Sequence, residues 1–211
     1  MYVGRRMTRK VITLSPMDTM RDAQRILLEN RIHHLPVVEG GELVGIVSDT
    51  DLRKWFLREE MVDEKGTVTR RIGHVGEIMT RDVVTMSPWD TIEDALLILH
   101  QRRFGSLPVV EGKKLVGIVT KADVLGMFID ALNIEEIGVR IEVILPQDMD
   151  SLVRLTRKLA EMRIEIRSLV LSPFGEEFAA FLRIGTIDVG TVKTRLREAG
   201  FNVPELADFL A

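Results

Sequence analysis

The first 130 residues contain the same hydrophobic and polar pattern twice. Residues 3–52 align with residues 75–124 at a constant offset of 72 and without a gap, and roughly 28 of about 50 aligned positions are identical. In each copy, short apolar runs that favour strands alternate with stretches whose apolar residues recur at helical spacing. Two copies of one unit imply that each copy buries the apolar face of the other.

Each copy predicts the element order β-α-β-β-α. A strand is expected at residues 11–14, which stop at Ser15-Pro16, and a helix should follow Thr19, which with Asp22 resembles a capping box. Two further strands are expected at residues 35–38 and 43–47, the second an apolar run of the kind that is covered on both faces. The last helix should begin at Ser48 or Asp49 and run through Leu52, Trp55 and Phe56.

The remaining third of the chain has a different pattern, which predicts the order βαββαβ of a ferredoxin-like domain. Apolar residues alternate with polar ones in the expected strands and lie on one face of each expected helix. The whole chain is therefore an α+β protein. The expected strands and helices lie at residues 139–143, 152–162, 164–167 and onward to a turn at 172–175, 178–184, 189–199 and 201–203, with Gly200 ending the second helix.

These patterns divide the chain into three folded parts and two linkers. The first copy should occupy residues 1–60 and the second residues 73–130, while the ferredoxin-like part covers residues 138–211. Residues 61–72 and 131–137 are then the linkers.

Composition excludes several classes of protein. The formal net charge is −3, which gives no long-range attraction to nucleic acid or to an anionic membrane surface. The chain has no cysteine, so disulfides and cysteine-based metal sites are excluded. No apolar run approaches the length of a membrane span, and the basic N-terminus lacks the apolar stretch of a signal peptide. We therefore expect a cytoplasmic protein.

The repeated motif resembles a known family. The pattern M-T, S-P-x-D-T, D-A, L-P-V-V and L-V-G-I-V-[ST]-x-x-D occurs in both copies and is similar to the CBS domain, a tandem pair of which is called a Bateman module. The last third resembles an ACT domain by its order of elements. The two together are similar to acetoin-utilisation regulatory proteins. The resemblance implies clefts between the repeats for AMP, ADP, ATP or S-adenosylmethionine, used as regulatory ligands rather than as catalytic cofactors.

The candidate ligand-binding residues lie where the last strand of each copy meets its helix. A hydroxyl there, with a carboxylate three residues later, stands at a helix N-terminus that favours an anion such as phosphate. The resemblance implies that Asp51 and Asp123 hold a ribose and that Ser48 and Thr120 face ribose or phosphate. The alternative is that these residues only cap their helices. The further candidates, at which the two copies differ, are His33, His34, Thr50, Ser106 and Lys121.

Two histidines in one copy only imply that the clefts differ in charge. His33 and His34 correspond to Gly105 and Ser106, and they could equally be partly buried residues at a strand entrance. A metal site is not expected, because adjacent residues on a strand point to opposite faces.

Binding rather than catalysis is the predicted function. The sequence has no Walker loop, G-x-G-x-x-G, G-x-S-x-G or H-E-x-x-H motif. We expect a sensor that forms a homodimer and acts on a regulated protein that the sequence does not name. The alternatives are a dimeric scaffold with unoccupied clefts and a small enzyme or enzyme subunit. The dimer expectation depends on apolar residues in the final helix of each copy: Trp55, Phe56, Leu57, Met127, Phe128 and Ile129.

Overall fold

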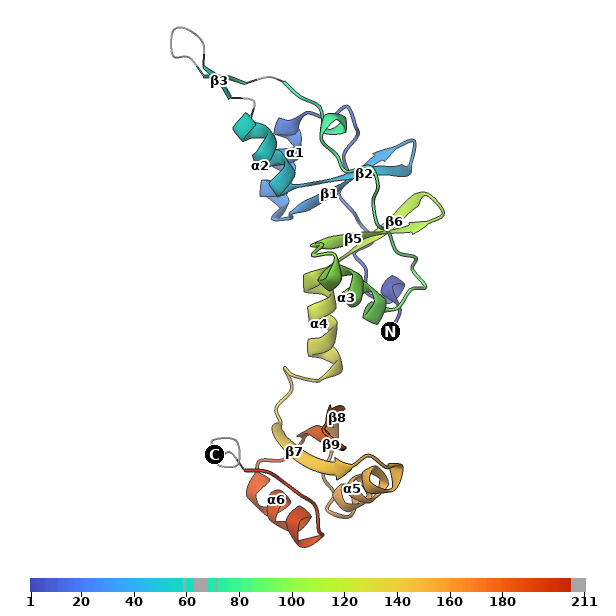
Figure 1. Ribbon diagram of the computed structural model, residues 1–211, viewed down its shortest axis with the longest axis vertical. Helices are drawn as coiled ribbons and strands as arrows, with labels where there is room; N and C mark the ends of the chain where they lie inside the picture. The colour runs from blue at the N-terminus through green and yellow to red at the C-terminus, as the bar shows by residue number, and fades with distance from the viewer. Residues whose placement is uncertain (59, 63–67, 71, 206–211) are drawn as a thin grey trace. The chain divides into compact units, whose positions relative to one another are not determined.

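The computed structural model describes residues 1–58, 60–62, 68–70 and 72–205 (Figure 1). The chain forms two compact units, Met1–Leu125 and Gly126–Ala211. Among the described residues, no helix has the length and apolar character needed to cross a bilayer. The first unit contains the first repeat and the second repeat up to Leu125, and the second unit contains the end of the second repeat and the last third of the chain.

The two repeats share one four-stranded sheet in the order β1-β2-β6-β5. Both hairpins have the same register and the same irregularity, with Val37 opposite Gly45 in one and Val109 opposite Gly117 in the other. The predicted helices and these four strands are therefore present in both copies. Their bounds are α1 Met20–Asn30, β1 His34–Glu39, β2 Glu42–Ser48 and α2 Asp49–Arg58, then α3 Ile92–Gln101, β5 Ser106–Glu111, β6 Lys114–Thr120 and α4 Lys121–Ala131.

The prediction of a strand at residues 11–14 is wrong. Only Leu14 joins the sheet, through one parallel bridge to Val37, and Met86 does the same with Val109. Leu14 donates to the Pro36 carbonyl over 3.0 Å and accepts from Val38 over 2.7 Å. Lys10, Val11 and Ile12, which precede it, line a cavity.

The segment that leads into each repeat packs on the other repeat. The 3-10 helix η1 (Val3–Arg5) donates from Val3 to the Asp90 carbonyl and from Gly4 to the Pro88 carbonyl. The equivalent helix η2 (Val75–Glu77) makes the matching bonds to Asp18 and Pro16. Each repeat is therefore completed by a segment of its neighbour, and the pair folds as one unit.

The expected linker at residues 61–72 contains a short hairpin. Strands β3 (Glu60–Val62) and β4 (Val68–Arg70) pair antiparallel, with Met61 opposite Thr69.

The second unit is a three-stranded antiparallel sheet, in the order β7-β9-β8, with two helices on one face (Figure 1). Its core joins Leu155 and Leu196 of the helices to Val143 and Leu182 of the sheet. The last strand, expected at residues 201–203, is reduced to one bridge between Asn202 and Ile144. The elements are β7 Val139–Pro146, α5 Met149–Glu161, β8 Ile166–Phe174, β9 Glu177–Ile184 and α6 Val189–Glu198.

Candidate functional site

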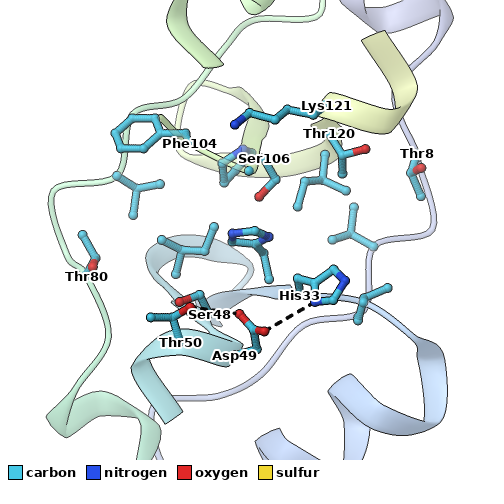
Figure 2. A pocket seen from close by; sticks show the side chains of 18 of the residues that line it. Thr8, His33, Ser48, Asp49, Thr50, Thr80, Phe104, Ser106, Thr120 and Lys121 are labelled. Carbon is cyan, nitrogen blue, oxygen red and sulfur yellow. Dashed lines mark hydrogen bonds and ion pairs between the residues drawn. The ribbon is translucent and has the colours of Figure 1, made fainter. Parts of the chain in front are cut away.

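A cavity of about 940 Å³ lies between the two repeats of the first unit. Figure 2 shows the strand ends and helix starts of both copies facing each other across it. This volume is at the upper end of the range for small-molecule sites. Asp123 is the one predicted site residue that is not part of the lining; those that line the cavity are His33, His34, Ser48, Thr50, Asp51, Ser106, Thr120 and Lys121.

The hydroxyl and carboxylate pairs at the starts of α2 and α4 have the same geometry. Asp51 Oδ2 accepts from the Ser48 backbone over 2.9 Å and from the Ser48 hydroxyl over 2.6 Å, and Ser48 Oγ accepts from the Asp51 backbone over 3.2 Å. Asp123 and Thr120 repeat this arrangement at 2.8, 2.7 and 3.2 Å. The capping role is therefore present in both copies. Only the first copy adds its carboxylate to the cavity wall.

The cavity lining is asymmetric in charge. Asp49 and Lys121 occupy equivalent positions in the two copies, as do Lys10 and Asp82. The carboxylate of Asp49 is partly neutralised by Arg53 at 3.2 Å, and His33 Nδ1 lies 3.5 Å from it. The Lys121 ammonium extends over the cavity near Ser106 (Figure 2), and it forms no ion pair with another described residue. The repeat 2 side of the cavity therefore offers the more available positive charge.

His34, Gly105 and Ser106 form the centre of the cavity wall. The His34 ring lies against Gly105, where any Cβ would overlap the imidazole. Ser106, which is equivalent to His34 in the repeat, is only 6% exposed, and its hydroxyl has no hydrogen-bond partner. A buried hydroxyl without a partner costs free energy unless another group, such as a ligand, supplies the bond.

Several lining residues were not found from the sequence. Thr8 and Thr80 lie just after η1 and η2, in the segments that lead into each repeat. Thr8 pairs with Ile118 and Thr80 pairs with Ile46, in each case a residue of the opposite repeat. Arg31 and Arg103 line the cavity with positive φ angles of 52° and 55°. The two threonines are equivalent in the repeat, and so are the two arginines, so the alignment of the repeats could have indicated these four residues. Their place in the cavity depends on the exchange between repeats, which the alignment does not show.

Burial holds the pKa of His34 below its ordinary value of 6.5, although Asp49 acts in the opposite direction. The folded state therefore binds a proton at His34 less readily than the unfolded state does. The contribution of His34 to the free energy of unfolding is therefore full above pH 6.5, and it is lost as the pH falls below that value. We expect the free energy of unfolding to fall between about pH 7.5 and about pH 5.5.

The His34→Gln variant should lose part of this pH dependence, as measured by urea unfolding at several pH values. His100→Gln is the matched control, because that histidine is exposed on α3 and does not act on His34. The same pH dependence in His34→Gln as in the unchanged chain would contradict the assignment.

Comparison with known proteins decides the family. The model of the CBS domain matches residues 3–58 and 75–130. The chain belongs to the CBS-domain family. Among curated relatives, MJ1225 of Methanocaldococcus jannaschii is 35% identical over 57% of this chain, and the chain spans 45% of its length. The CBS domain-containing protein YhcV of Bacillus subtilis is 32% identical over 56% of this chain and 78% of its own length.

Solved structures of CBS proteins resemble the same part of the chain. CBSX2 in complex with AMP is 30% identical, covers 64% of this chain and 98% of its own, and has a TM-score of 0.52. The CBS domain pair of MJ0100 in complex with 5'-methylthioadenosine and S-adenosyl-L-methionine is 27% identical over 61% of this chain and 95% of its own, with a TM-score of 0.51. A Vibrio cholerae protein described as acetoin utilization protein AcuB has 29% identity, covers 64% of this chain and 95% of its own, and has a TM-score of 0.53.

Proposed function

We propose that this CBS-domain chain is a regulatory sensor that binds an adenine nucleotide or a related adenosyl ligand in the cavity between its repeats. The observation that carries this proposal is the unpartnered hydroxyl of Ser106, buried in the wall of a cavity that two helix N-termini also border. The CBS pairs of CBSX2 and MJ0100, which hold AMP and S-adenosyl-L-methionine, support the choice of ligand class.

The ligand should lie mainly on the side of the cavity formed by Ser48, Thr50 and Asp51. Thr80 lies on this side as well (Figure 2). The second oxygen of the Asp51 carboxylate is available to accept from a ribose diol, since its capping bonds to Ser48 use Oδ2. Lys121 and the Ser106 hydroxyl supply the donors for a phosphate or another polar group of the ligand.

The second unit serves as an ACT-like domain in this proposal, for dimerisation or for a second effector. Its elements follow the ferredoxin-like order, with Asn202 bridging β7 on the side away from β9. The loop from β7 to α5 holds no glycine, which limits close approach of backbone to a ligand. We therefore favour dimerisation over binding of a free amino acid. The regulated partner would be another protein.

The apolar residues that suggested a homodimer divide into three groups. Trp55 and Met127 are buried in the chain itself, and Phe56 and Ile129 are half-buried. Leu57 and Phe128 are exposed and are the ones available for a second copy. Light scattering that shows a monomer at micromolar concentration would reject the homodimer.

A thermal-shift screen of the full chain tests the ligand class. The probes are AMP, ADP, ATP, NAD, S-adenosylmethionine and free amino acids. A ligand at a hundred times its dissociation constant stabilises the folded state by about 2.7 kcal/mol, which raises Tm by about 5–10 °C for a chain of this size. We expect such a shift with at least one adenosyl compound and none with amino acids. No shift with any probe would favour the scaffold with unoccupied clefts.

A further inference from the structure

His34 places a titratable ring where both repeats border the cavity. It begins β1 of repeat 1 and is half-buried. Its imidazole lies against repeat 2, since a Cβ added to Gly105 would be 2.9 Å from His34 Nε2, and both residues line the cavity. No hydrogen bond or ion pair joins the imidazole to another described residue. The ring can therefore gain a proton without breaking a bond.

Two further donors lie beside the same glycine. Lys121 donates from its backbone N–H to the Gly105 carbonyl over 3.2 Å, and its ammonium extends over the cavity near Ser106 (Figure 2). The Ser106 hydroxyl is buried and has no partner. A protonated His34 completes a group of three donors, two of them cationic. Such a group suits a phosphate better than a neutral or cationic part of a ligand.

The groups that face His34 come from both repeats and act in opposite directions. Burial has the largest effect and, with His33 and Lys121, it disfavours the protonated ring. Asp49 and Asp51, at the start of α2, favour it. The net result is a pKa of His34 below its ordinary value of 6.5, so the ring is neutral at pH 7 when no anion lies beside it. The other charged residues of the cavity wall are Lys10, Arg31, Asp82 and Arg103.

We propose that the binding of a phosphate-bearing ligand in this cavity is coupled to the uptake of a proton by His34. This inference rests on the proposed function, because it names the charge of the ligand that the cavity takes. An anion within about 4–6 Å of an imidazole favours its protonated form. The protonated ring then donates to the phosphate beside Lys121 and Ser106. Occupancy of the cavity therefore rises as the pH falls, and the chain responds to pH as well as to ligand concentration.

NMR measures the protonation of His34 in the full, unchanged chain. The Cε1–H resonance of His34, assigned by its loss in His34→Gln, should titrate about one pH unit or more higher with saturating AMP than without it. Adenosine, which has the same base and sugar but no phosphate, is the matched control ligand and should leave this titration in place. The resonance of His100, an exposed residue on α3, should not move with either compound.

Calorimetric titration measures the affinity that follows from this coupling. The uptake of one proton changes an affinity by at most about tenfold per pH unit. Relative to His34→Gln, the unchanged chain should therefore gain about two- to tenfold in AMP affinity between pH 7.5 and pH 6.5. The comparison with the variant is needed because the phosphate of AMP itself titrates near pH 6. His100→Gln should behave as the unchanged chain does.

The outcomes separate this inference from the proposed function. AMP binding with no change in the titration of His34, or with an equal change in adenosine, would overturn the proton coupling and leave the adenosyl site standing. The same pH dependence of AMP affinity in His34→Gln as in the unchanged chain would do so too, as would binding of adenosine or S-adenosylmethionine without binding of AMP. Binding of none of the three compounds would remove the proposed function and this inference together.

Discussion

Replacing Asp51 with alanine should weaken the binding of AMP or another ribose-bearing ligand about ten- to hundredfold. A hydrogen bond from a ribose hydroxyl to a charged group contributes roughly 1.5–3 kcal/mol, and each 1.4 kcal/mol is about a factor of ten in affinity. Asp51 is one of the residues that line the cavity between the repeats. Calorimetric titration of AMP into the variant measures the change.

Asp123→Ala is the matched control for this variant. Asp123 caps α4 through the same three bonds that Asp51 makes at α2, but it does not line the cavity. Both variants should lose the same two bonds from the Asp carboxylate and therefore a similar amount of stability. Only Asp51→Ala should lose much affinity. Equal affinities in the two variants, both unchanged, would remove the ribose role and favour the scaffold.

Replacing Gly45 with alanine should destabilise the first unit by about 1–3 kcal/mol, the usual cost of overpacking. A Cβ at Gly45 would lie 2.6 Å from Met79 Sδ and 3.1 Å from the Thr80 carbonyl oxygen. That carbonyl is fixed because it accepts from Ile46 over 3.0 Å, while Thr80 donates to Ile46 over 2.9 Å. The lead-in segment of repeat 2 therefore needs glycine beneath it, and the change should loosen the contact between repeats.

The same substitution at Gly126 should act in the opposite direction. Gly126 lies within α4, and a Cβ there would meet nothing within 4 Å. Alanine is the better helix former by up to about 1 kcal/mol, so Gly126→Ala should leave stability unchanged or raise it. Urea unfolding of both variants measures the difference. A Gly45→Ala protein as stable as the unchanged chain would contradict the packing of Met79 on β2.

The local elements could be predicted from the sequence because their signals are local. Thr19 and Asp22 begin α1 as expected, with Asp22 donating to Thr19 Oγ1 over 3.1 Å. Gly200 follows the C-terminus of α6, and its φ of 85° is the left-handed conformation expected of a glycine that ends a helix. The strands expected at residues 11–14 and 201–203 were wrong because strand formation depends on a partner. Both segments find a partner for one residue only.

The site could be predicted only in part, since some of its lining residues come from segments that cross from one repeat to the other. Ser48 and Thr120 lie at strand ends that the repeated motif marks, and both line the cavity. Thr8 and Thr80 reach the cavity because each lead-in segment crosses to the opposite repeat. The motifs placed a carboxylate in both copies without indicating which one reaches the cavity, and of the two only Asp51 lines it.

The central claim is that an adenosyl ligand occupies the cavity between the repeats, on the side of Asp51. Calorimetric titration of AMP, and separately of S-adenosylmethionine, into the Thr50→Trp and Ala122→Trp variants tests it most directly. These exposed residues occupy equivalent positions in the two copies and both line the cavity. The account predicts saturable binding to the unchanged chain and to Ala122→Trp, and loss of binding when tryptophan at position 50 fills the ligand's place. Unchanged binding in Thr50→Trp, or no binding of either compound to the unchanged chain, would contradict it.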